Sequence, residues 1–335
     1  MSHQRWHAIE KIQVEIAAAV ALAAMYFLIW PFLKPWDADG VVAFLPLGAF
    51  GRLAEFILAV WLLAGVSALL TVSARPEGAL LATLAGAGGA SLHSEPMRLL
   101  LMRFEHDLSG LLLPAALELA CMISVVLGAT VVIQLVRGLV TQVRPGWVWR
   151  PVPLLGGVAT GQTTQPPTGW ADVALFLLVG RVPLRWVHDL PTRRMPSKAP
   201  TGEAAVNMVA CGGLTLLLGL LLMIGTLFST DRGQIIFSLA LSFFLAAGVA
   251  SYFFPVRFST PCWIAPVLLG IAAYLKLSSM PFTGVLTWGG VDAWGHILPV
   301  DWISAGCGGA VGGYWLSCRL HDLKHLPEEG GVTDE

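Results

Sequence analysis

Long apolar runs without charged residues constrain the fold of this chain more than any other feature. Five are clear, at residues 16–33, 56–72, 108–136, 204–228 and 235–254. A bilayer core about 30 Å thick needs about 20 apolar residues per helix, so each run predicts a transmembrane helix. Shorter or glycine-rich runs at 79–92, 263–277 and 302–316 can also span where protein surrounds them. The sequence predicts an all-α fold, a polytopic transmembrane helical bundle with about eight spans, or six if two weak runs fail together.

The composition agrees with lipid as the main solvent and partner. Charged residues make up only 12% of the chain, whereas soluble domains carry about 25%. Lys plus Arg (20) and Asp plus Glu (21) nearly balance, so no overall field favours nucleic acid. The five cysteines lie in or beside apolar runs without a CxxC pair, which is typical of small buried side chains. Nucleotide, c-type haem and common hydrolase motifs are absent, and no cofactor is identified.

Basic residues predict the orientation. With the N-terminus inside, most Lys and Arg fall on the inner side, and the outer side holds only Lys34, Arg52, Arg98, Arg103 and Arg232. Because positive residues collect in cytoplasmic loops, this asymmetry favours an N-in and C-in topology. A retained first span and this pattern fit a bacterial inner membrane.

The chain divides around one long basic segment. We expect a first group of about four spans in residues 1–136, a cytoplasmic loop at 137–203, a second group of about four spans at 204–319, and a cytoplasmic tail at 320–335. Within the loop, residues 170–180 are apolar but too short to span, which predicts an interfacial helix. The loop is a candidate site for anionic lipid or a soluble partner, although topology alone also explains its charge. The outer segment VVAFLPLGAFG, at 41–51, is expected to lie on or dip into the membrane.

Glu118 is the sharpest single residue because it lies well inside an apolar run. A charged carboxylate there costs about 2.5–3.5 kcal/mol on insertion scales, so the group is expected to be protonated, paired or facing a watery cavity. Two interpretations stay open: a proton or cation relay, and a neutral carboxyl bonded to a neighbouring helix. Pro114, in the same run, predicts a kink or a strong tilt.

Small residues spaced four apart form the strongest local pattern. Gly86 with Ala90, Gly308 with Gly312, and Gly309 with Gly313 allow helix backbones to approach closely. Packing within the chain is the favoured interpretation, with a dimer face as the alternative. AGAGGA at 85–90 also resembles AGCGGA at 305–310. A duplication of four helices would not superpose these runs, so the match is interpreted as shared small-residue chemistry.

His and acidic residues gather on the predicted outer side. His106, Asp292 and His296 are the candidate ligands of a divalent metal, because imidazole and carboxylate together suit such ions. The spacing matches no helical metal motif, so solvated charges that cap helix ends are the favoured alternative. Asp107, directly before a helix start, is expected to act as such a cap.

Three functions remain open. The first is a non-catalytic membrane subunit or scaffold that binds membrane-protein partners, which demands least of the sequence. The second is a small-solute or ion transporter that uses Glu118. The third is a membrane-embedded enzyme with the outer His and Asp cluster, and an enzyme is the less favoured class.

Overall fold

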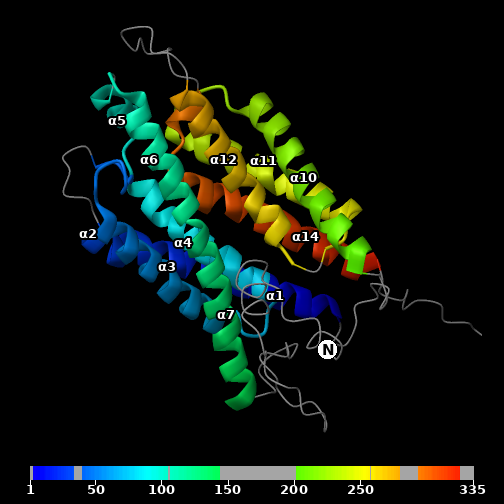
Figure 1. Cartoon of the computed structure of the whole chain (residues 1–335). Coiled ribbons are helices and arrows are strands. Elements are labelled where there is room, and N and C mark those ends of the chain that lie inside the picture. Colours follow the sequence, from blue (N-terminus) through cyan, green and yellow to red (C-terminus); the bar gives the residue numbers. More distant parts are fainter. Residues whose placement is uncertain are drawn as a thin grey trace, which may run out of the picture.

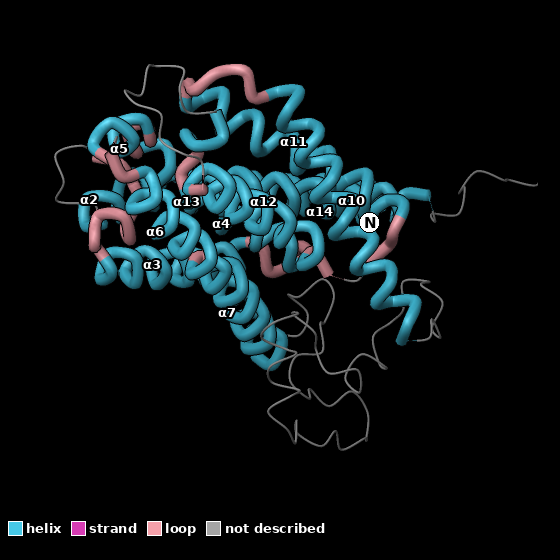
Figure 2. The backbone as a smooth tube through the Cα atoms, turned by 45° about the horizontal axis from the view of Figure 1, so that its top comes forward, coloured by secondary structure: helices cyan, strands magenta, loops and turns pink. Residues whose placement is uncertain are grey.

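The computed structural model describes residues 3–33, 40–104, 106–143, 201–256, 258–279 and 293–324. Within these ranges every regular element is a helix, and Figure 2 shows only helices and their connecting loops. Most of the cytoplasmic loop predicted at 137–203, namely residues 144–200, lies outside the described residues, as do its interfacial helix at 170–180 and the end of the tail at 325–335. The flanks of that loop are helical, because one helix continues to Val143 and the next begins at Thr201.

The described residues form helices in the following order. In chain order they are α1 (His3–Ala23), the π-helical turn η1 (Ala24–Ile29), α2 (Trp30–Leu33), α3 (Phe50–Leu70), α4 (Pro76–His93), α5 (Arg98–Arg103), α6 (Leu108–Cys121), α7 (Ile123–Val143), α10 (Thr201–Thr226), α11 (Arg232–Phe253), α12 (Thr260–Ser278), η3 (Ala293–His296), α13 (Pro299–Asp301), the π-helical turn η4 (Trp302–Cys307) and α14 (Gly308–Lys324). Helices α1 to α7 and α10 to α14 form two neighbouring groups (Figure 1).

Six segments of the described residues are long and apolar enough to cross a membrane: Glu10–Leu33, Phe50–Leu70, Leu108–Val140, Ala205–Thr226, Arg232–Phe253 and Thr260–Ser278. Large apolar side chains such as Phe27, Leu62, Val209 and Phe228 point outward and are more than two-thirds exposed. Such a surface suits lipid, since a soluble protein would hide this apolar area. The chain is therefore an all-α integral membrane bundle, although only six of the expected eight segments qualify by length and composition.

Two expected spans are not long and apolar enough to be counted among these six segments: α4, and η4 together with α14. They lie where the two groups of helices meet. Both are rich in glycine and alanine, and most of α4 is buried, as is all of η4. Each contacts the other, and each also packs on a long helix of its own group. Because protein surrounds them, they need fewer large apolar side chains than a helix that faces lipid.

Contacts between glycines and neighbouring helices fix the directions of the central helices. Helix α4 runs parallel to α1, since Gly78 lies against Val14 and Gly89 against Met25. The bundle consequently has two ends, which we name by a residue at each. The Glu10 end holds the start of α1 and of α4, and the Arg232 end holds the start of α11 and the end of α4.

The long apolar run at 108–136 forms two consecutive helices, α6 and α7. Helix α6 continues through Pro114, and the interruption falls at Met122, whose N–H donates to the carbonyl of Glu118. The kink or strong tilt expected at Pro114 stays a prediction. Helix α6 packs mainly on α12, whereas α7 packs on α3, so this span contacts both groups.

Candidate functional site

A short non-helical segment enters the bundle between α2 and α3. Val41, Val42, Ala43 and Phe44 are completely buried, although the sequence allowed this segment to lie on the surface. A tight turn reverses the chain, because the N–H of Ala49 donates to the carbonyl of Phe44 at 2.7 Å. Irregular backbone is tolerated at membrane depth only where protein or a water-filled cavity satisfies its polar groups. We call residues 40–49 the re-entrant segment.

Glu118 on α6 supplies the partners that the re-entrant segment needs. Its Oε2 accepts hydrogen bonds from the backbone N–H groups of Phe44 at 2.7 Å and of Leu45 at 2.8 Å. The side chain is fully buried, and its Oε1 has no hydrogen-bond partner among the described residues. One carboxyl oxygen is therefore structural, while the other remains available inside the protein.

The connection between α4 and α5 holds the other side of the segment. The hydroxyl of Ser94 accepts from the N–H of Val42 at 2.8 Å, and the N–H of Glu95 donates to the carbonyl of Gly40 at 3.3 Å. Gly40 has a φ of +63°, a left-handed conformation that side chains other than glycine rarely adopt. Helices α4 and α6 thus fix the depth of the segment from two sides.

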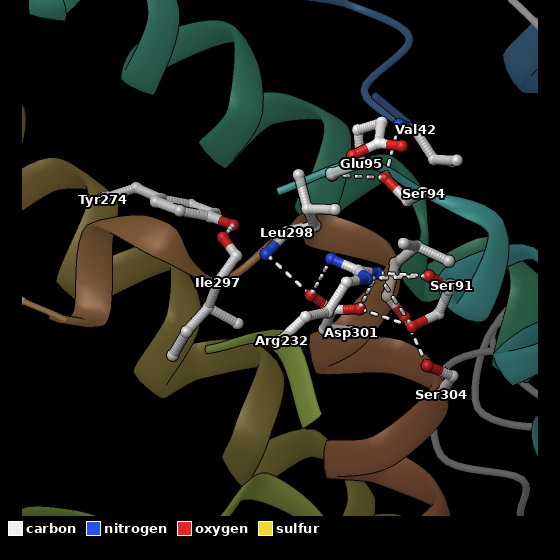
Figure 3. A network of polar contacts seen from close by, with 11 residues as sticks. Val42, Ser91, Ser94, Glu95, Arg232, Tyr274, Ile297, Leu298, Asp301 and Ser304 are labelled. Atoms are coloured by element: carbon white, nitrogen blue, oxygen red, sulfur yellow. Dashed lines mark hydrogen bonds and ion pairs between the residues drawn. The ribbon is translucent and has the colours of Figure 1, made fainter. Parts of the chain in front are cut away.

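A second buried network lies at the Arg232 end and joins three helices (Figure 3). The guanidinium of Arg232 lies 2.9 Å from Asp301 Oδ1 and also donates to the carbonyl of Ser91. The Ser91 hydroxyl donates to Asp301 Oδ1 at 2.6 Å, and the N–H of Leu298 donates to Oδ2 at 3.1 Å. The side chain of Asp301 is fully buried and that of Arg232 is 16% exposed, which makes this a largely buried, hydrogen-bonded ion pair.

A third network lies at the Glu10 end. Arg137, only 2% exposed, donates to the carbonyl of Thr71 at 3.1 Å and lies within electrostatic range of Glu77 and Glu10. Oε1 of Glu10 accepts from the backbone N–H of Arg75 at 3.2 Å. The indole nitrogen of Trp315 on α14 lies 3.5 Å from the same oxygen. The sequence-based assignment of Arg137 to the cytoplasmic loop is therefore wrong, since it is buried in α7.

The candidate metal ligands are not brought together in the part of the chain that the structure describes. No group of three or more His, Cys, Asp or Glu side chains lies within metal-binding distance there. His106 is exposed, His296 is almost buried, and Asp292 lies outside the described residues, so the metal site stays a prediction. Asp107 caps α6 as expected. The N–H of Gly110 and the hydroxyl of Ser109 donate to its carboxylate and lower the pKa of Asp107 below its ordinary value.

The predicted helix-packing residues lie at close helix contacts within the chain. A Cβ on Gly309 would overlap the backbone carbonyl of Ala240, and one on Gly313 would overlap that of Phe244. On α4, Gly86 lies against Ala21 of α1, and Ala90 is fully buried. Gly308 and Gly312 face Leu84 and Leu81 of α4, respectively. The faces formed by these small residues therefore pack against other helices of the same chain.

Sequence reasoning found Glu118 but not its partners. Backbone N–H groups carry no signal in the sequence, so their approach to a carboxylate 73 positions away could not be predicted. Sequence reasoning also did not predict the pairing of Arg232 with Asp301, because 69 positions separate the two residues. Comparison with family models, with curated proteins and with solved structures finds no match.

Proposed function

We propose that this protein is a small-solute or ion transporter with eight spans, both ends of the chain in the cytoplasm, and Glu118 as its proton- or cation-binding group. The observation that carries the proposal is the free carboxyl oxygen of Glu118 beside buried irregular backbone. Ionisable residues within spans mark ion or substrate pathways, and non-helical segments at membrane depth line such pathways.

The directions of the helices support the proposed eight-span topology. Helix α4 is parallel to α1 and must return through the bundle between α3 and α6, so it adds one crossing to the six apolar spans. Helix α14 with η4 runs parallel to α11 and adds the eighth. The Glu10 end then carries most of the basic residues and faces the cytoplasm of a bacterial inner membrane. A reporter fused after Asp231 that proved cytoplasmic would contradict this layout.

The contacts of Glu118 fit a residue that couples ion binding to a conformational change better than they fit a purely structural residue. A structural role needs only the two bonds from Phe44 and Leu45, and both go to Oε2. An ionised carboxylate with an unpaired oxygen is costly away from water, so the group gains free energy when it binds a proton or a small cation. Binding at Oε1 would also weaken the acceptor Oε2, which links occupancy to the position of the re-entrant segment.

The transport proposal is tested in liposomes that contain the purified protein. A potassium diffusion potential drives uptake, a trapped pH dye reports protons, and radioactive sodium reports a cation. Wild-type uptake of one probe above that of empty vesicles, lost in Glu118→Gln, is the expected result. Glu15→Gln is the matched control, because Glu15 is exposed and pairs only with Lys11 on the surface of α1. Uptake no faster than in empty vesicles for both probes, or equal uptake in wild type and Glu118→Gln, overturns the proposal.

The scaffold hypothesis loses one of its supports. One support was the glycine-rich faces, and the small faces of α4 and α14 are occupied by helices of the same chain. Its other supports are the sparse charge within the spans and the basic loop, most of which lies outside the described residues. The enzyme hypothesis depended on the outer His and Asp cluster, and the described residues contain no group of three or more His, Cys, Asp or Glu side chains that could hold a metal ion.

A further inference from the structure

Helices α4 and α14 cross each other in opposite directions at the centre of the bundle. A Cβ on Gly88 would lie 3.8 Å from Ser304 Cβ, and one on Gly308 would lie 3.7 Å from Leu84 Cβ. Further along, Gly312 approaches Leu81 at the same distance of 3.7 Å. The contact of residue 88 with 304 becomes the contact of 308 with 84 when each residue is exchanged for the one 220 positions away. That offset is also the one that aligns AGAGGA with AGCGGA.

Each crossing helix packs on its own parallel partner through equivalent glycines. On α4, a Cβ on Gly86 would meet Ala21 of α1 at 3.1 Å, and one on Gly89 would meet the carbonyl oxygen of Leu22 at 2.9 Å. The aligned positions repeat both contacts on the other side of the crossing. In both cases a backbone carbonyl of the partner helix fills the space that a side chain would need.

In the second group, Gly306 of η4 lies against Leu239 of α11, and a Cβ on Gly309 would overlap the carbonyl of Ala240. Position 306 aligns with 86, and position 309 aligns with 89. Their partners are consecutive residues in both units, 239 and 240 on α11 and 21 and 22 on α1. A common offset of 218 relates these partners. Two independent helix contacts therefore obey the same correspondence as the sequence match.

The third helix of each group extends the correspondence. Gly86 also meets Leu63 of α3, and Gly306 also meets Pro266 of α12. Helices α3 and α12 are the second helices of α1–α3–α4 and of α11–α12–α14. The span of α6 and α7 lies across both, with α7 on α3 and α6 on α12. Helix α10 has no counterpart among the described helices and packs on α11 and α12.

The two polar networks occupy corresponding places at opposite ends. At the Arg232 end, the start of α11 is tied to Ser91, near the end of the α4 of the other unit. At the Glu10 end, the start of α1 approaches Trp315, well along the α14 of the other unit. Glu10 and Trp315 each lie about one helical turn from the positions that the two offsets assign to Arg232 and Ser91. Each network therefore joins the first helix of one unit to the crossing helix of the other.

We infer that α1–α3–α4 and α11–α12–α14 are inverted repeats about a pseudo-two-fold axis through the α4–α14 crossing, and that the two networks are alternate gates of one path along this crossing. This inference rests on the proposed transport function. Inverted repeats in transporters place the substrate at their interface near the middle of the bilayer, and the units rock against each other around it. Opening the Arg232 gate favours access from outside, and opening the Glu10 gate favours access from the cytoplasm.

The test measures access to the crossing from each side of the membrane. Ser304→Cys is introduced after the five native cysteines are replaced by alanine, and a membrane-impermeant maleimide is added to either side of oriented vesicles. Ser304 is almost buried and lies opposite Gly88, so its labelling reports on the crossing. Arg232→Gln or the milder Ser91→Ala breaks one gate, and Glu10→Ala breaks the other because it removes the oxygen that accepts from the Arg75 N–H and the Trp315 indole. Lys276→Gln and Lys11→Gln are the controls at the two ends, since both lysines are exposed.

The two gate variants should have opposite effects on the labelling of Ser304→Cys, and each effect should depend on the side from which the maleimide is added. Breaking the Arg232 gate raises labelling from outside about tenfold, equivalent to about 1.4 kcal/mol, and lowers labelling from the cytoplasmic side. Glu10→Ala has the reverse effect, and the controls leave both rates unchanged. Equal increases from both sides, as in a misfolded protein, or no change in either gate variant overturn the inference. If the gate variants shift labelling between the two sides but the wild type takes up no ion, only the Glu118-coupled transport is rejected. If the wild type takes up ions but labelling does not shift, only the gates are rejected.

Discussion

The carboxylate of Glu118 and the backbone nitrogen of Leu45 lie 2.8 Å apart, although 73 positions separate them in the chain. This bond, together with the one to Phe44, holds irregular backbone inside a helical membrane bundle. The same side chain keeps one oxygen without a partner among the described residues. A single residue thus links the stability of the re-entrant segment to a group that can bind a proton or a cation.

Replacing Glu118 tests the structural half of this link. Glu118→Ala leaves two buried N–H groups without acceptors, which should lower the free energy of unfolding by roughly 2 kcal/mol or more. Glu118→Gln keeps an acceptor oxygen and should cost clearly less. Thermal unfolding in detergent measures stability, and hydrogen exchange at residues 40–49 measures release of the segment. Unchanged exchange in Glu118→Ala would show that other contacts hold the segment.

Gly48, in the turn of the re-entrant segment, has a φ of +70° and open space around its Cα. Gly48→Ala should therefore destabilise the protein by roughly 1–2 kcal/mol through backbone strain alone. Gly51→Ala is the matched control, because Gly51 is helical, also has open space, and should be neutral or slightly stabilising. Equal unfolding temperatures for the two variants would contradict the left-handed turn.

The contact between α11 and α14 predicts a sharp difference between two glycines. Gly313→Ala would force a Cβ into the carbonyl of Phe244, so the helices must separate at a cost of about 1–3 kcal/mol or more. Gly213→Ala on α10 meets no atom within 4 Å and should stabilise the protein by up to about 1 kcal/mol. Thermal unfolding of both variants checks the prediction, and a stable Gly313→Ala protein would exclude the close crossing.

The ion pair of Arg232 with Asp301 should behave as a buried one. Arg232→Met leaves the carboxylate uncompensated and should cost about 3–5 kcal/mol, whereas adding Asp301→Leu should recover much of the loss. Lys11→Met is the control, since its pair with Glu15 is exposed at 3.6 Å and should contribute at most about 1 kcal/mol. A double variant as unstable as Arg232→Met would mean that the two charges are not coupled.

The cap of α6 gives a pH dependence with a defined sign. Hydrogen bonds from Gly110 and Ser109 lower the pKa of Asp107 from its ordinary value of 3.8. Its stabilising effect should be complete above that value and disappear as the pH falls through the lower pKa of the folded state. Unfolding temperatures of wild type and Asp107→Ala should differ by a few degrees at most at pH 7 and converge at strongly acidic pH. A difference that grows on acidification would contradict the cap.

Part of the site could be predicted from single residues, and part could not. Glu118 was detectable because a carboxylate in an apolar run is expensive in lipid, whatever surrounds it. Arg137 was missed because it lies where the apolar run ends, and a residue there can belong to a loop or to a buried helix end. Arg232 and Asp301 were each visible as charges, but 69 positions separate them and nothing local relates them.

The fold shows the same division. The sequence by itself determined the membrane-spanning helices, because the free energy of burying backbone in lipid depends on long apolar runs and little else. The direction in which small faces pack, the depth of residues 40–49 and the pairing of α4 with α14 depended on the tertiary structure. Those features arise from contacts between distant segments, and a glycine that meets a backbone carbonyl has the same sequence signature as one that meets nothing.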